Sequence, residues 1–317
     1  MVLQTLSARI ARIEHAHLPN AGNARRKHAY IPDASKARIE HTRVPGSNSP
    51  AANEEGARIA THRLSVVLPV YNEEEVIAAT IEGLLETLHA NFSDFEIIPV
   101  NDGSQDRSGA ILTQLAALHP EIRVVTHERN LGYGATLADG FAAASKELTL
   151  FMDSDGQFDS RDLPRLLTFI DEYDAVLGYR LQRQDSRVRK LNAWGWKTLV
   201  RLLLGVRVRD IDCAFKILRT DFLQNYPPET RGAMINAEML YNLKQAGYNY
   251  REVGVRHLPR QGGRATGANP RVILKAFREL LQYTWRRRVL GQQRVPQLQP
   301  VRQDGQRVSS KVDVSDF

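Results

Sequence analysis

The segment "ELTLFMDSDGQF" (147–158) carries the clearest information about the fold. A largely apolar run stops abruptly at Asp153, and a second carboxylate, Asp155, follows with only Ser154 between them. A short, continuously apolar run is typical of a strand that is buried on both faces. In parallel sheets covered by helices, ligands bind beyond the carboxyl ends of the strands. The two acids therefore stand where a binding crevice is expected.

The chain around this segment alternates between short apolar strands and amphipathic helices of about ten to fifteen residues. Asn72 is the expected N-cap of the first helix. This alternation predicts an α/β fold with a mainly parallel central sheet and helices on both faces. The predicted strands are 64–70, 95–100, 122–126 and 147–152, and the predicted helices are 72–88, 107–119 and 130–145.

Composition divides the chain into three parts. Residues 1–62 are rich in Arg, His, Asn, Ala and Pro without a sustained period, which predicts a poorly ordered basic N-terminal arm; the arm repeats "ARIEH" at 11–15 and 37–41. Residues 63–290 form the predicted globular domain. Gln, Pro, Ser and charged residues dominate 291–317, which indicates a flexible C-terminal tail.

The charge balance and the apolar content restrict partners and location. Lys and Arg total 43 against 36 acids, a net charge of +7, so an anionic partner is expected. One cysteine excludes an intrachain disulfide framework and suits a reducing compartment. No run of 18 apolar residues occurs, so no transmembrane segment is expected. The expected location is the cytoplasm, either free or peripheral at the inner face of a membrane, and nothing in the sequence sets an oligomeric state.

The sequence lacks several common nucleotide-binding and nucleic-acid-binding motifs. "NLGYGATL" (130–137) contains G-x-G but lacks the third glycine and the later ribose-binding acid of a dinucleotide fold. The chain has no G-x-x-x-x-G-K-[ST] phosphate loop. Its basic residues do not interleave with aromatic residues in a nucleic-acid motif, so no nucleic-acid partner is expected.

Asp153 and Asp155 point to metal chemistry. Just beyond a strand end, two carboxylates two residues apart can converge on one hard cation, and Mg²⁺ or Mn²⁺ prefers such oxygen ligands. The cation would then support a diphosphate as the leaving group. Alternatively, the acids are ordinary solvated or capping residues at a turn.

Seven segments in order resemble the family 2 glycosyltransferases, and most closely dolichol-phosphate mannose synthase and the bacterial undecaprenyl-phosphate glycosyltransferases. They are "VVLPVYNEEEVI", "VNDGSQDRSG", "ERNLGYGATLADGF", "LFMDSDGQF", "VLGYR", "DIDCAFKILR" and "HLPRQGGRATG", within about residues 63–285. The resemblance implies the GT-A fold. It also implies inverting, metal-dependent transfer of a sugar from a UDP- or GDP-linked donor to a polyprenyl phosphate.

The same resemblance implies roles for individual residues. Pro69, Tyr71 and Glu73 correspond to the cradle of the base and ribose, and Asp102 to the base-binding acid, although Asn101 stands where the family often has another acid. The remaining members of the implied nucleotide-sugar site are Asp153, Ser154, Asp155, Gln157, Arg260 and Arg264. The implied metal ligands are Asp153, Asp155, Gln157 and, less directly, His257.

The acceptor decides the remaining chemistry. A polyprenyl phosphate is already anionic and needs no general base, and Arg180, Arg187 and Arg189, with Lys190 beside them, would bind its phosphate. A hydroxyl acceptor on a saccharide, protein or small molecule would need a base, for which Asp210 or Asp212 is available. The abundance of arginine favours the phosphate. A non-catalytic nucleotide-sugar-binding protein is the third alternative.

Two segments combine tryptophan with basic residues. "LNAWGWKTLVRLLLG" (191–205) and the Trp285 to Arg288 segment combine apolar and basic residues in a way typical of helices that lie on a lipid surface. The alternative is that both helices pack on the sheet through their apolar sides. Family members that glycosylate lipid phosphates often continue into transmembrane helices, which this sequence does not show.

Overall fold

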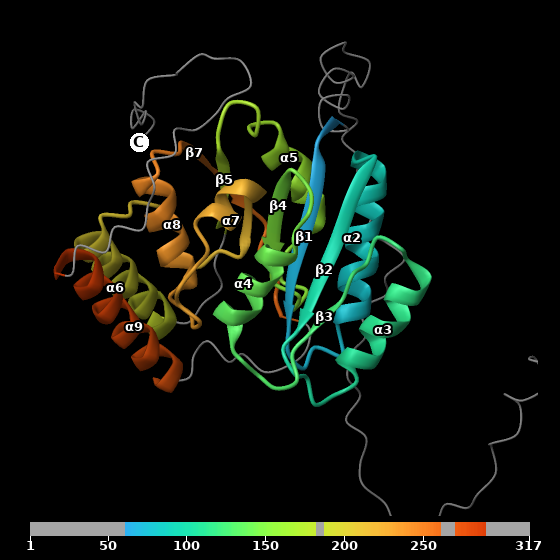
Figure 1. The fold of residues 1–317 in the computed structure, drawn as a ribbon, viewed down its shortest axis with the longest axis horizontal. Helices are drawn as coiled ribbons and strands as arrows, with labels where there is room; N and C mark the ends of the chain where they lie inside the picture. The colour runs from blue at the N-terminus through green and yellow to red at the C-terminus, as the bar shows by residue number, and fades with distance from the viewer. Residues whose placement is uncertain (1–60, 182–186, 261–269, 290–317) are drawn as a thin grey trace, which may run out of the picture. The chain divides into compact units, whose positions relative to one another are not determined.

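The structure is a computed structural model that describes residues 61–181, 187–260 and 270–289 (Figure 1). Side chains are described from residue 192 in the helix after the first gap, and from 274 to 287 in the last helix. The predicted N-terminal arm with its repeat, the predicted C-terminal tail and Arg264 lie outside the described residues. The described residues all belong to one unit, which spans 48–317.

Seven strands of the described residues form one sheet in the order β3-β2-β1-β4-β6-β5-β7. Strand β6 runs antiparallel to β4 and β5, and the other neighbouring strands pair in parallel, so the predicted mainly parallel sheet is confirmed. The strands are β1 (Arg63–Val70), β2 (Asp94–Asn101), β3 (Val125–Thr126), β4 (Leu148–Met152), β5 (Ala175–Arg180), β6 (Phe215–Arg219) and β7 (Tyr250–Val255).

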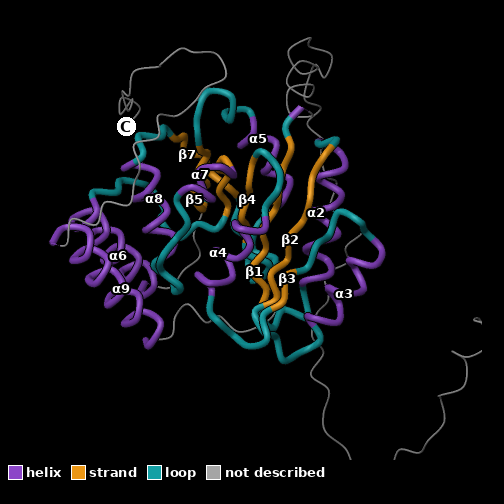
Figure 2. Tube along the Cα trace, viewed as in Figure 1, coloured by secondary structure: helices purple, strands orange, loops and turns teal. Residues whose placement is uncertain are grey.

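Helices cover both faces of this sheet (Figures 1 and 2). The chain steps outward from β1 to β3 and then returns to β4, and right-handed connections therefore place α4 on the face opposite α2 and α3. The helices are α2 (Ile77–Asn91), α3 (Ser108–Leu118), α4 (Tyr133–Ala143), α5 (Leu163–Leu167), α6 (Arg187–Leu204), α7 (Thr220–Asn225), α8 (Ile235–Gln245) and α9 (Pro270–Val289), with a short 3-10 turn, η2 (Ser160–Asp162).

Helix α2 shows how the sequence pattern produces this packing. Its apolar residues recur every three or four positions and all lie on the buried side of the helix, as predicted. They meet β1, which is buried on both faces from Leu64 to Leu68. The buried residues of α2 are Ile77, Ile81, Leu84, Leu85, Thr87 and Leu88.

Asn72 does not cap α2, which is where the structure departs from the sequence prediction. The helix begins five residues later at Ile77, and Asn72 adopts a left-handed backbone with φ of 55°. Asparagine tolerates this conformation better than most residues. Its side-chain Oδ1 accepts a hydrogen bond from the Gln105 amide at 2.8 Å, so Asn72 joins two loops instead of starting a helix.

The parallel strands all end at one edge of the sheet, and β6 begins there. Strands β1 and β4 are neighbours, but the chain leaves them in opposite directions, and such a reversal opens a crevice at the strand ends. The loops gathered at this edge are 71–76, 102–107, 127–132, 153–159, 205–214 and 256–260.

Candidate active site

The two aspartates of the opening segment lie at this edge, directly after β4. Gly156 adopts φ of +72°, a conformation that glycine allows without strain, and turns the chain immediately after Asp155. The Gln157 amide donates to Asp155 Oδ1 at 3.1 Å, and the Tyr133 hydroxyl donates to Asp153 Oδ1 at 3.2 Å. Both carboxylates are therefore oriented by donors from the surrounding chain.

The electrostatics of this pair favour a cation. Asp153 is only partly exposed and its carboxyl is surrounded by protein atoms; this burial and the neighbouring Asp155 raise its pKa to about 7, against the Tyr133 hydrogen bond, which lowers it. A cation would relieve the repulsion between the two carboxylates and favour their ionised forms. Two carboxylates at a strand end are thus a donor set that fits Mg²⁺ or Mn²⁺. Among the described residues, no three His, Cys, Asp or Glu side chains gather as a metal site.

Arg260 lies between Asp155 and Glu73. Its Nη1 donates to Asp155 Oδ2 at 3.1 Å, and its Nη2 donates to Glu73 Oε1 at 2.5 Å. The other oxygen of Glu73, Oε2, is buried without a hydrogen-bond partner in the described part of the chain. Burial raises the pKa of Glu73 above its ordinary value, although the charge of Arg260 opposes the shift. One arginine thus brings together two acids that were predicted to bind the donor.

Side chains cross-link the loops that follow β1, β2 and β4. The Ser154 hydroxyl donates to the Pro69 carbonyl, so it ties the end of β1 to the acid pair. Tyr71 lies in the loop that follows β1 and is partly exposed. The cross-links are Ser154 Oγ to Pro69 O at 2.6 Å, Glu73 N to Ser108 Oγ at 2.9 Å, Glu74 N to Asp106 Oδ2 at 3.1 Å and Asn72 N to Ser104 Oγ at 3.1 Å.

Asp102 is occupied by the loop that precedes α4. Its carboxylate is 3% exposed and accepts hydrogen bonds from the Leu131 amide at 2.8 Å and the Gly132 amide at 2.9 Å. His127 Nδ1 lies 2.8 Å from Asp102 Oδ1, and His127 Nε2 lies 3.1 Å from Asp139 Oδ2. These contacts make Asp102 a residue that holds this loop, and its contact with a nucleobase stays a prediction.

Arg180 and Asp210, two residues of the predicted acceptor site, form a bidentate ion pair. Arg180 Nε donates to Asp210 Oδ2 at 2.7 Å, and Nη2 donates to Oδ1 at 2.8 Å, with both side chains largely buried. Burial alone would lower the pKa of Arg180, but the pair with Asp210 outweighs it and raises the pKa. Because both oxygens of Asp210 face this guanidinium, Asp210 orients Arg180, and its role as a general base stays a prediction.

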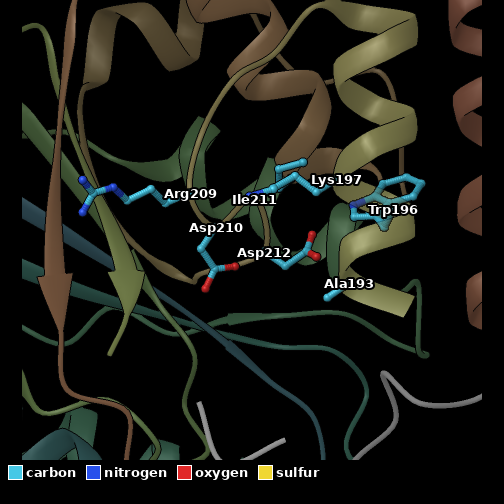
Figure 3. Close-up of a pocket in the computed structure, with 7 residues that line it drawn as sticks. All are labelled: Ala193, Trp196, Lys197, Arg209, Asp210, Ile211 and Asp212. Atoms are coloured by element: carbon cyan, nitrogen blue, oxygen red, sulfur yellow. The ribbon is translucent and has the colours of Figure 1, made fainter. Parts of the chain in front are cut away.

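Lys216 supports the loop that carries Asp210 and Asp212. Its side chain is fully buried, its Nζ donates to the Ile211 carbonyl at 3.1 Å and to the Cys213 carbonyl, and it lies 5.2 Å from the centre of the Phe151 ring. Burial lowers the pKa of this lysine. In Figure 3 the Asp212 carboxylate lies on the side of Ala193 and Trp196, whereas that of Asp210 points away from them. The small hollow in this view is lined by Ala193, Trp196, Lys197, Arg209, Asp210, Ile211 and Asp212.

His257 is held beside the acid pair through packing. It forms an isolated bridge with Phe158, and the two rings meet edge to face with centroids 5.5 Å apart. Gln157 Nε2 donates to the Leu258 carbonyl at 3.1 Å, which orients the amide of Gln157. Metal ligation by Gln157 and His257 stays a prediction. Arg187, Arg189 and Lys190 lie in α6, but their side chains are outside the described residues, as is all of Arg264.

Helices α6 and α9 lie side by side at one end of the sheet (Figure 1). The Trp196 and Phe277 rings join them edge to face, with centroids 5.7 Å apart. No helix in the described ranges combines the length and the apolar character needed to cross a bilayer. Large apolar side chains nevertheless face solvent on both helices: Trp194 is 63% exposed, Leu202 70%, Leu274 72%, Leu281 57% and Trp285 56%.

Several of these residues were not singled out from the sequence. Tyr133, Asp139 and Lys216 lie inside segments that resemble the family but received no role, and His127 directly precedes one of those segments. Their common signal is position, since His127 follows β3, Tyr133 begins α4 and Lys216 pairs with Phe151 of β4.

Comparison with known proteins agrees with this geometry. An undecaprenyl-phosphate 4-deoxy-4-formamido-L-arabinose transferase of Pectobacterium atrosepticum is 37% identical over 159 residues, which are 49% of this chain and 48% of that protein. A dodecaprenyl-phosphate galacturonate synthase of Rhizobium johnstonii is 28% identical over 183 residues, 56% of this chain and 52% of that protein. The chain thus spans about half the length of the curated relatives it matches.

Among solved structures, glucosyl-3-phosphoglycerate synthase of Mycobacterium tuberculosis, in complex with Mn²⁺, UDP and glucosyl-3-phosphoglycerate, superposes with a TM-score of 0.59. The identity is 21%, and the superposition covers 73% of this chain and 83% of that one. A likeness at this identity shows the fold, and it confirms the predicted GT-A fold. The model of the family described as glycosyl transferase family 2 matches residues 65–226, which is just over half of the chain, and the chain belongs to that family.

Proposed function

We propose that the chain is an inverting glycosyltransferase that moves a sugar from a nucleotide-diphosphate donor to a polyprenyl phosphate. The observation that carries the proposal is the pair Asp153 and Asp155 at the β1 and β4 strand ends, with Arg260 and Glu73 beside it. The relatives named above as undecaprenyl- and dodecaprenyl-phosphate enzymes support the acceptor class.

The donor diphosphate is placed at the acid pair. Asp153 and Asp155, with the amide oxygen of Gln157, would hold Mg²⁺ or Mn²⁺ there. A divalent cation bound at these residues would offset the charge of the departing nucleotide diphosphate. Arg260 would exchange its carboxylate partners for diphosphate oxygens, which match its planar fork. Structures of glucosyl-3-phosphoglycerate synthase hold Mn²⁺ or Mg²⁺ together with UDP, which supports both the metal and a uridine nucleotide.

The nucleoside is placed in the cross-linked loops beyond β1 and β2. Glu73 Oε2, buried without a partner in the described part of the chain, is positioned to accept a hydrogen bond from a ribose hydroxyl. Pro69 and Tyr71 line the same loop. Because side chains already join these loops, little ordering would be needed on binding, which favours affinity for a rigid nucleoside.

The acceptor is placed on the β5 side of the crevice. Arg180, held rigidly by Asp210, offers a cation to an acceptor phosphate, and Arg187 and Arg189 are further cations for it. Since a lipid phosphate is already anionic, its oxygen can attack the sugar without a general base. A hydroxyl acceptor is the alternative, and Asp212 is then the better base because Asp210 is engaged by Arg180.

A lipid acceptor requires a membrane contact, for which α6 and α9 are suited. Leu274, Arg278, Leu281 and Trp285 recur at intervals of three and four residues, so they share one exposed face of α9. Apolar side chains among basic ones are typical of helices that lie in the headgroup layer of an anionic membrane. We place the chain at the inner face of a membrane through these helices.

A transfer assay tests the proposal. The full chain is incubated with Mn²⁺, undecaprenyl phosphate and radiolabelled UDP- or GDP-sugars, and the label is followed into organic solvent. Metal-dependent extraction of label supports the proposal. Label that moves only to soluble hydroxyl acceptors overturns the lipid acceptor, and donor binding without transfer to any acceptor indicates a non-catalytic sugar-nucleotide-binding protein.

A further inference from the structure

A second polar atom near the acid pair, the side-chain oxygen of Asn236, is buried without a partner. Asn236 is the second residue of α8 and is 5% exposed. Its Oδ1 makes no hydrogen bond to any described residue. This unpaired oxygen is unusual, because buried polar atoms in native proteins nearly always have a partner.

The neighbours of Asn236 show which of its groups are used. Its side chain contacts the hydroxyl of Tyr133, and that hydroxyl donates its only proton to Asp153 Oδ1 at 3.2 Å. The contact from Asn236 is therefore a donation from its amide nitrogen, and this leaves Oδ1 as an acceptor.

The starts of α4 and α8 are brought together by close backbone packing. A side-chain carbon on Gly134 would lie 2.5 Å from the Gly232 carbonyl oxygen, so glycine is needed for this approach. Glu238, which is fully buried, accepts hydrogen bonds from the Glu229 amide at 2.8 Å, the Thr230 amide at 2.8 Å and the Thr230 hydroxyl at 2.6 Å. The loop before α8 is thereby fixed, and Asn236 is held beside Tyr133.

The position of this oxygen relative to the acid pair identifies the class of ligand. In a nucleotide sugar, the sugar is bonded directly to the diphosphate, so a diphosphate at Asp153 and Asp155 brings sugar hydroxyl groups close to Tyr133 and Asn236. Hydroxyl groups are donors that a lone amide oxygen can accept.

We propose that Asn236 Oδ1 accepts a hydrogen bond from a hydroxyl group of the transferred sugar, and that Tyr133 aligns Asn236 with Asp153. The inference rests on the proposed function and adds a subsite to it. Asn236 then contributes to binding of the sugar and not to binding of the nucleoside diphosphate. The two contributions can be separated because the bare diphosphate lacks the sugar.

The test compares affinities for a sugar nucleotide and for its bare diphosphate. Calorimetry with Mn²⁺ measures UDP against UDP-glucose and UDP-galacturonate, and GDP against GDP-mannose, for the wild-type chain and Asn236→Ala. We expect Asn236→Ala to weaken the sugar nucleotide that the wild type prefers by about tenfold, with the bare diphosphate within about twofold of the wild type. Asn242→Ala is the matched control, because Asn242 is a buried amide on the same helix that bonds to the Tyr283 hydroxyl at 3.1 Å. This control should leave the ratio of the two affinities unchanged.

The outcomes separate the subsite from the proposed function. Equal losses for sugar nucleotide and bare diphosphate in Asn236→Ala overturn the subsite and leave the donor site intact. A wild-type chain that binds every sugar nucleotide no more tightly than the bare diphosphate also overturns the subsite. A wild-type chain that binds neither nucleotide overturns the proposed function, and the subsite with it.

Discussion

The two sides of the crevice are built differently. On the β1 and β2 side, two acids accept hydrogen bonds from backbone amides: Asp102 from Leu131 and Gly132, and Asp106 from Glu74. On the β5 side, charges pair with other side chains, as Arg180 does with Asp210. That side also adjoins α6 and α9, on which five large apolar side chains are exposed: Trp194, Leu202, Leu274, Leu281 and Trp285.

This difference between the two sides indicates how one sheet can bind two kinds of substrate. A nucleotide is rigid and polar, and a side of the crevice fixed by amide contacts can match it before it arrives. A lipid phosphate presents one compact charge on a long apolar chain, for which a buried, oriented guanidinium next to an exposed apolar surface is suitable. The following changes test whether each side has the role assigned to it.

The largest effect is expected on the donor side, at Asp155. Asp155→Asn removes a carboxylate from the acid pair, and transfer should fall on the order of 10² to 10³ because leaving-group stabilisation is lost. Turnover of radiolabelled sugar nucleotide at saturating Mn²⁺ measures the effect. Asp171→Asn, at an exposed surface acid, is the control. If Asp155→Asn turns over at the wild-type rate, Asp155 is not a ligand of the catalytic metal.

The next largest effect is expected at Arg180, on the acceptor side. Arg180→Lys keeps the charge but loses the planar fork that pairs with Asp210. The KM for undecaprenyl phosphate should rise by about tenfold or more, while the affinity for UDP changes little. Steady-state kinetics with varied acceptor, beside calorimetry with UDP, distinguishes the two. If Arg180→Lys weakens only UDP binding, Arg180 belongs to the donor site and not to the acceptor site.

The exposed apolar face of α9 is expected to act only at membranes. Leu281→Ser combined with Trp285→Ser should weaken binding to phosphatidylglycerol-containing vesicles by about tenfold or more, since two large apolar side chains lose their burial in lipid. Vesicle co-sedimentation measures the binding. Leu118→Ser is the control because Leu118 is 74% exposed on α3, on the donor side. If Leu118→Ser weakens binding as much, the membrane contact is not specific to α6 and α9.

The smallest effect is expected at Lys216, where a substitution should reduce activity without reducing stability. Lys216→Met removes a buried charge whose desolvation is costly, so the free energy of unfolding should stay unchanged or increase. The loop of Asp210 and Asp212 loses two hydrogen bonds to Ile211 and Cys213, and transfer should fall by about tenfold. Urea unfolding and turnover are measured on the same sample. Parallel losses of stability and activity would make Lys216 an ordinary part of the core.

Sequence reasoning placed the acid pair at the sheet edge because the information for that position is local. An apolar strand that ends in Asp153-Ser154-Asp155 specifies a position at the sheet edge, and the same rule applies to the turns after β1 and β2. The period of Ile77, Ile81 and Leu84 likewise predicted the buried side of α2. These features depend on residues close together in the chain.

Contacts between distant segments could not be found in that way. The engagement of Asp210 by Arg180 joins residues 30 positions apart, and the bridge from Arg260 to Glu73 joins residues 187 positions apart. The approach of Asn236 to Tyr133 depends on the close packing of Gly134 against Gly232. Sequence could nominate Asp210 as a base, but only the paired geometry shows that its oxygens are engaged.

The central claim is that the acceptor is a lipid phosphate. The most direct measurement compares sugar transfer by the full chain to undecaprenyl phosphate and to undecaprenol, under the same donor, Mn²⁺ and detergent. The account predicts transfer to the phosphate alone, with Asp212→Asn remaining active because no general base is required. Equal transfer to the alcohol, lost in Asp212→Asn, would contradict it.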